Sequence, residues 1–163
     1  MAIKLTDAPA PRRLAECPAR VATTEEGALI HAAFLAGVED GIIPRDFGMN
    51  VRTASSAGFT MIDDQAGETE AFSDGVIWVH VDLARPPAVL GRVALHEVGH
   101  VGFLLMPGHE DYRLGRIRDA ATFRRLNAES EAFACAFAAR WLPSAPIQAA
   151  IRRLELARAA GSN

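Results

Sequence analysis

The sequence predicts an α+β fold, in which a small, mostly antiparallel β-sheet packs against a few helices. Helical patterns occur towards both ends of the chain, β-branched and alternating residues gather between residues 47 and 83, and Gly or Pro separates the segments. The length of 163 residues suits one domain with a sizeable core. We therefore expect a single domain over residues 23–163, preceded by a flexible, proline-containing N-terminal arm over residues 1–22.

Composition narrows the class of protein. Half of the residues are hydrophobic and the formal net charge is −3, which argues against a broadly basic surface for nucleic acid. The two cysteines, Cys17 and Cys135, lack C-x-x-C spacing and favour a reducing compartment. The N-terminus does not resemble a secretory signal, and no stretch approaches the roughly 18 apolar residues of a membrane span. We expect a cytoplasmic protein with no membrane or nucleic-acid partner, and the oligomeric state stays open.

The individual elements follow from local patterns. Thr23 or Thr24 is expected to cap a first helix, which ends at Gly41 and Pro44. Strands are predicted over residues 49–52, 58–62 and 75–83. Three further helices are predicted over residues 87–105, 119–142 and 146–159. Leu156 is expected to face the core from the last of them.

The helix expected over residues 87–105 carries His96-Glu97-Val98-Gly99-His100 within an apolar run. This H-E-x-x-H pattern is typical of zinc metallopeptidases. Residues four apart lie on the same helix face, so the imidazoles of His96 and His100 can converge on one Zn²⁺ ion. Glu97 can then reach a water on that ion and act as general base.

Two histidines need a third protein ligand, because a catalytic zinc site has three protein ligands and one open position. A glutamate on the following helix would complete the set. Glu131 and Glu129 are both candidates, and His109 is their main rival. A metzincin site is not expected, since Phe103 and Met106 occupy the glycine and third-histidine positions of that pattern.

The segment over residues 129–143, E-S-E-A-F-A-C-A-F-A-A-R-W-L-P, resembles the second motif of the ImmA/IrrE-type metallopeptidases. That motif has the form E-x-x-A-x-x-F-A-A, followed by apolar residues and a proline. The matching residues are Glu131, Ala134, Phe137, Ala138, Ala139, Trp141, Leu142 and Pro143. The resemblance covers residues 75–143 and implies a zincin-like, gluzincin-type domain in which Glu131 is the third metal ligand. The small polar residue that the family places after the glutamate corresponds to Cys135.

The motif and the resemblance together imply a zinc-dependent metallopeptidase with a narrow protein or peptide substrate. The alternative is a catalytically silent or structural-zinc module that uses the same fold for regulation or binding. The strand over residues 76–81 can bind a peptide by strand addition, or it is a buried strand paired on both edges. His109 or Tyr112 can stabilise the oxyanion, although either can equally be an ordinary loop residue. An arginine cluster is interpreted as a solvated face; it comprises Arg113, Arg116, Arg118, Arg124 and Arg125.

Overall fold

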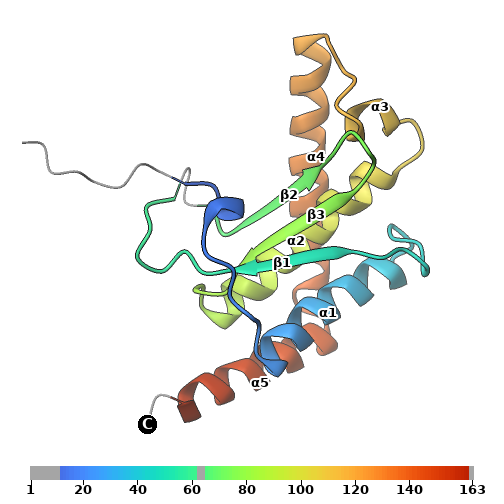
Figure 1. Ribbon diagram of the computed structural model, residues 1–163. Helices are drawn as coiled ribbons and strands as arrows, with labels where there is room; N and C mark the ends of the chain where they lie inside the picture. Colours follow the sequence, from blue (N-terminus) through green and yellow to red (C-terminus); the bar gives the residue numbers. More distant parts are fainter. Residues whose placement is uncertain (1–11, 62–64, 162–163) are drawn as a thin grey trace, which may run out of the picture.

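The computed structural model describes residues 12–61 and 65–161. Its elements are η1 (Leu14–Glu16), α1 (Thr24–Glu39), β1 (Asn50–Ala54), β2 (Gly67–Ala71), β3 (Ile77–Asp82), α2 (Pro87–Leu105), α3 (Glu110–Arg113), α4 (Ala120–Trp141) and α5 (Ala145–Gly161) (Figure 1). The predicted α+β class is confirmed in this part of the chain. Residues 1–11 of the expected arm lie outside the described residues.

The sheet is mixed, so the expectation of a mostly antiparallel sheet is wrong. Its strand order is β1-β3-β2, with β1 parallel and β2 antiparallel to the central β3. A strand was predicted over residues 58–62, but residues 58–61 form no strand. Met61 makes only an isolated bridge to Arg12. The strand is instead β2, whose Gly-Glu-Thr-Glu-Ala sequence suits a polar sheet edge.

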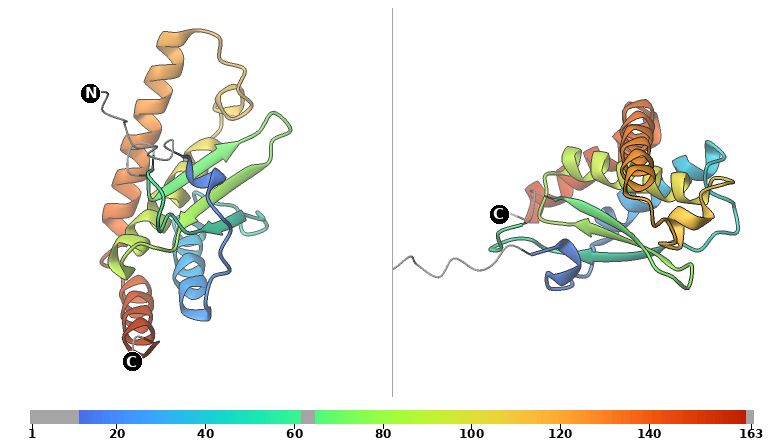
Figure 2. Two further views of the ribbon diagram at one scale, coloured as in Figure 1. Left: turned by 60° about the vertical axis from the view of Figure 1, so that its left-hand side comes forward. Right: turned by 90° about the horizontal axis from the view of Figure 1, so that it is seen from above.

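The helices cover one face of the sheet (Figures 1 and 2). Val79 and Val81 of β3 point into the core, where α2 contributes Leu95 and Val98. The remaining helices pack around α2, and α5 buries Ile147, Ile151 and Leu154 as expected. Leu156 does not face the core and is 72% exposed, so its predicted burial is wrong.

The opposite face of the sheet carries the N-terminal segment that contains η1 (Figure 2, right). Leu14 and Cys17 are buried there beside Ala54. The Arg52 guanidinium donates hydrogen bonds to the carbonyl groups of Leu14 and Cys17, and Arg20 N donates to the backbone of β1. Residues 12–20 of the expected arm therefore pack against the sheet, and the flexibility of the arm stays a prediction.

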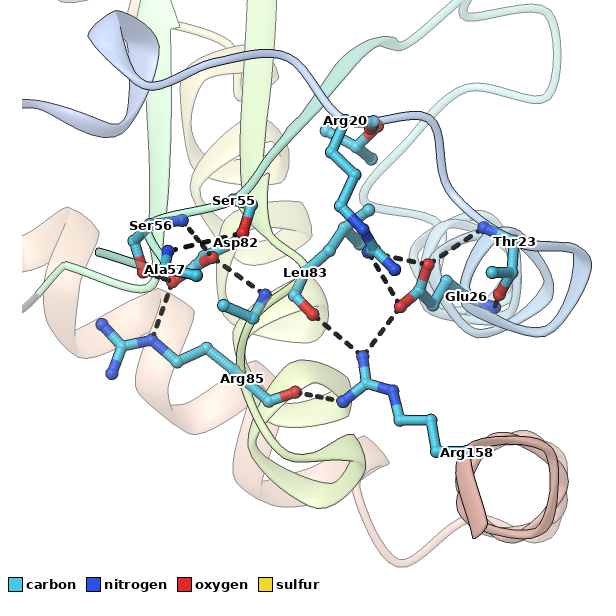
Figure 3. A network of polar contacts seen from close by, with 12 residues as sticks. Arg20, Thr23, Glu26, Ser55, Ser56, Ala57, Asp82, Leu83, Arg85 and Arg158 are labelled. Carbon is cyan, nitrogen blue, oxygen red and sulfur yellow. Dashed lines mark hydrogen bonds and ion pairs between the residues drawn. The ribbon is translucent and has the colours of Figure 1, made fainter. Parts of the chain in front are cut away.

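A buried acid joins the two ends of the domain (Figure 3). Glu26, in the first turn of α1, forms a capping box with Thr23. Its carboxylate also accepts hydrogen bonds from Arg20 and from Arg158 of α5. Arg158 donates further to the backbone carbonyls of Leu83 and Arg85. This network fixes α5 against α1 and the turn that leads into α2.

Helix α2 is long and apolar enough to cross a membrane, judged by length and composition alone. The sequence expectation that no such stretch exists is therefore wrong. Within the fold, 56% of this window is buried by the rest of the chain, as in the core helix of a soluble protein. Its apolar character is thus accounted for by the core packing just described.

Candidate metal centre

Close packing of α2 against α4 positions the candidate site. Gly99, between the two motif histidines, lies directly against Ala134 of α4. A Cβ atom built on Gly99 would be 2.7 Å from the Ala134 Cα atom, which is too close for any side chain. The pair of small residues lets the two helix backbones approach, and Glu131 lies one turn before Ala134 on α4. The contact therefore brings a carboxylate of α4 over the histidines of α2.

Three side chains converge at this contact. The Nε2 atoms of His96 and His100 are 3.0 Å apart. The Glu131 carboxylate oxygens lie 3.4 Å from His96 Nε2 and 3.5 Å from His100 Nε2. Among the described residues, this is the one group of His, Cys, Asp or Glu side chains arranged to hold a metal ion.

These spacings fit a tetrahedral ion. Two ligands that each lie 2.0–2.1 Å from such an ion are about 3.3 Å from each other, close to the three separations observed. Two imidazoles with one carboxylate match the ligand set of a catalytic zinc site, although the donor atoms alone do not identify zinc.

The second ring nitrogen of each histidine has its own neighbour. His100 Nδ1 lies 2.8 Å from the buried Ser130 Oγ, and His96 Nδ1 lies 3.8 Å from Cys135 Sγ. A proton held at Nδ1 leaves the Nε2 lone pair free for a metal. Burial lowers the pKa of both histidines, against the attraction of Glu131. The rings are therefore neutral near pH 7, as metal ligation requires.

Glu97 lies beside the ligand group and is almost fully buried. The Thr69 hydroxyl of β2 donates a hydrogen bond of 2.7 Å to Glu97 Oε2. Gly67 allows β2 to approach this closely, because a Cβ atom there would lie 2.5 Å from Glu97 Oε1. Burial raises the pKa of Glu97 to about 8, against the hydrogen bond from Thr69 and with help from the charge of Glu131.

An open cleft of about 540 Å³ lies between β2, α2, α3 and α4, and it is lined by the ligand group and by Glu97. Tyr112 of α3 also lines it and donates a hydrogen bond to Asn127 Oδ1. Asn127 precedes Glu131 by one helical turn, which places the Tyr112 hydroxyl near the ligand group. Burial and the charge of Glu131 raise the pKa of this hydroxyl, so it stays protonated and able to donate.

The rival residues lie elsewhere. Glu129 points to solvent and pairs with Arg125 at 2.7 Å, so the structure places Glu131 rather than Glu129 beside the histidines. His109 Nδ1 lies 2.7 Å from the Phe103 carbonyl oxygen, with its ring against Phe103. It is neither part of the ligand group nor among the residues that line the cleft.

The strand expected to bind a peptide by strand addition over residues 76–81 is the central strand β3, paired on both sides. Of the two alternatives for this strand, the structure supports pairing on both edges, and β2 is the edge strand beside the site. Two supporting residues, Thr69 and Ser130, were missed by sequence reasoning. Ser130 could have been found from its position directly before Glu131 and four residues after Leu126, on the buried side of α4. Thr69 carried no such signal, because its strand was not recognised.

Comparison with protein-family models, with curated proteins and with solved structures gave no match for this chain. The assignment of the site therefore depends on the geometry of its own residues.

Proposed function

We propose that the protein is a zinc-dependent metallopeptidase of the compact gluzincin type, similar to the ImmA/IrrE-type enzymes. One observation supports this above all: His96, His100 and Glu131 converge in an open cleft with the buried acid Glu97 beside them. A structural zinc site is closed by four protein ligands. The group found among the described residues has three and faces solvent, which favours catalysis over the regulatory alternative.

In this proposal His96, His100 and Glu131 hold the zinc. When bound, the ion supplies Lewis-acid chemistry, polarising a peptide carbonyl and acidifying water. Glu97 accepts the proton of the attacking water and then delivers it to the leaving amine. Burial raises the pKa of Glu97 to about 8 in the metal-free chain, and the charge of a bound cation would lower it towards the carboxylate form that accepts this proton.

Other residues of the cleft orient these steps. The Thr69 hydroxyl holds one oxygen of the Glu97 carboxylate at 2.7 Å, which leaves the other oxygen for the water. Tyr112 has a protonated hydroxyl near the ligand group and can donate a hydrogen bond to the oxyanion that forms during attack.

The peptide substrate is expected to lie along β2. This strand pairs with β3 on one side, and no strand in the described residues pairs with its other edge. An extended peptide can add to a free edge through main-chain hydrogen bonds. Such binding would place a peptide bond between Thr69 and the ligand group. The short edge strand offers few main-chain hydrogen bonds to an added peptide, which suits a narrow protein or peptide substrate.

The test compares the wild type with Glu97→Gln and His96→Ala variants, using a proteome-derived peptide library read by mass spectrometry. Glu97→Gln should abolish hydrolysis and keep zinc, whereas His96→Ala should lose both. His31→Ala, on the exposed side of α1, is the matched control and should keep both. Retained turnover in Glu97→Gln would defeat the mechanism. Zinc binding without any cleavage in the wild type would favour the regulatory alternative.

A further inference from the structure

The cleft continues beyond the ligand group towards α3. Helix α2 lines it with His96, His100 and Leu104, and α4 lines it with Glu131, Asn127 and Phe123. Members of each row are four residues apart, so each row follows one helix face. Eight residues of helix span about 12 Å. The cleft thus offers a subsite one to two helical turns away from the metal ligands.

Arg113, the last residue of α3, lines this end of the cleft. It is the only Arg or Lys among the described residues that line the cleft. Its Nε atom is buried and has no hydrogen-bond partner. A buried donor left unsatisfied costs about 1–3 kcal/mol and calls for an explanation.

Neighbouring arginines on the same stretch of chain differ from Arg113. Arg116 lies 3.9 Å from Asp111, and Arg125 pairs with Glu129. Both arginine side chains are at least 60% exposed. The interpretation of the arginine cluster as a solvated face therefore fits these two arginines and does not fit Arg113.

The surroundings of Arg113 indicate what it binds. Leu104 and the half-exposed Phe123 give this end of the cleft apolar walls. The acidic residues that line the cleft are Glu68, Glu97 and Glu131. A cationic group of a substrate is attracted to these acids, whereas an anionic group is attracted to Arg113. A guanidinium presents a fork of donors that matches a carboxylate. The apolar walls formed by Leu104 and Phe123 suit the aliphatic part of a substrate residue that carries the carboxylate.

We propose that Arg113 forms a subsite for a carboxylate of the peptide substrate, supplied by an acidic side chain or by the C-terminus. The inference rests on the proposed peptidase function and adds a specificity residue to it. Arg113 binds the substrate at a distance from the bond that is cleaved and takes no part in the chemistry.

The experiment measures binding to the zinc-loaded full chain by calorimetry, with hydroxamates as probes because they chelate the metal. The first pair consists of two short peptides that end in a hydroxamate and differ at one residue, which is Glu in one peptide and Gln in the other. The other pair is a hydroxamate-capped peptide with either a free or an amidated C-terminus. Linkers of about four to eight bonds cover one to two helical turns. The two pairs distinguish a side-chain carboxylate from a terminal one.

In at least one pair, the carboxylate probe should bind the wild type roughly ten- to a hundredfold more tightly than its neutral partner, as expected for a charge-assisted hydrogen bond. Arg113→Gln should remove this preference and leave the binding of the neutral probe unchanged, which also shows that the variant is folded. Arg113→Lys should keep part of the preference. Arg116→Gln, the matched control outside the cleft, should keep all of it.

Equal binding of both members in each pair would overturn the carboxylate subsite and leave the metal centre intact. An unchanged preference in Arg113→Gln would overturn it as well. Failure of all the probes to bind would instead overturn the metal centre, and the subsite with it.

Discussion

Replacing Glu97 by Gln should stabilise the zinc-free protein while removing its activity. Burial raises the pKa of Glu97 from 4.5 to about 8. Between these values the unfolded chain has lost the proton and the folded chain retains it, so folding takes up a proton. The stability of the zinc-free protein therefore falls as the pH rises through this window. Because Gln carries no titrating proton, the variant lacks this loss.

The magnitude follows from the size of the shift. One pKa unit corresponds to about 1.4 kcal/mol, so the wild type loses about 3 kcal/mol between about pH 5 and about pH 8 through this one group. Urea denaturation in the presence of a chelator measures it. Glu97→Gln should differ little from the wild type at about pH 5 and should be more stable by about 3 kcal/mol at about pH 8.

The exposed Glu129 provides the control, since Glu129→Gln should show no comparable pH-dependent gain. Other groups that titrate in this range do so in both proteins and cancel in the comparison. An equal stability difference between wild type and Glu97→Gln at both pH values would refute the reasoning, because it would mean that Glu97 titrates normally in the folded protein.

Three further predictions concern packing, the ligand support and acid stability. Gly99→Ala should destabilise the protein by about 1–3 kcal/mol, because the added methyl group forces α4 away from α2. Gly27 has open space around it, so Gly27→Ala should stabilise α1 by up to about 1 kcal/mol. Thermal denaturation measures both changes. Ser130→Ala should weaken zinc binding about 10- to 100-fold, because His100 Nδ1 loses its partner; competition with a chromogenic chelator measures the affinity. Burial raises the pKa of Glu26, but hydrogen bonds from Thr23 and two arginines outweigh it and lower that pKa below 4.5. Its stabilising contribution should therefore be present above about pH 4.5 and be lost as the pH falls further, and acid unfolding should shift to higher pH in an Arg158→Ala variant.

The parts of the fold that could be predicted from sequence are those with a strong local signal. The apolar run and Pro87 at its first position defined α2 closely. The start of α1 was predicted at Thr23 or Thr24, and the structure selects Thr23 as the cap. The spacing of His96 and His100 predicted their convergence, because four residues return to the same helix face.

Other features depend on tertiary contacts and left no such signal. Strand β2 has no apolar alternation, since it is a polar edge with Glu68 and Glu70 facing away from α2 and towards Arg13. The apolar segment before residue 62 gave a stronger strand pattern, but Met61 and Phe59 instead cover the small cluster around Leu14.

The choice between Glu129 and Glu131 also needed the structure. Both lie on α4, and the residue pattern alone let Glu129 share a face with Phe133 and Phe137. The contact between Gly99 and Ala134 decides it, because it sets the rotation of α4 and turns Glu131 towards the histidines. A resemblance in the second motif had favoured the same residue, but the approach of the two helices supplies the physical reason.

The central claim is that His96, His100 and Glu131 hold one catalytic zinc ion. The most direct measurement is the zinc content of the purified protein by inductively coupled plasma mass spectrometry. It compares the wild type with the Glu131→Ala and Glu129→Ala variants. We predict one zinc per chain in the wild type and in Glu129→Ala, and loss of zinc from Glu131→Ala. A wild-type protein that takes up no zinc, or a Glu131→Ala variant that binds it as tightly as the wild type, would contradict the claim.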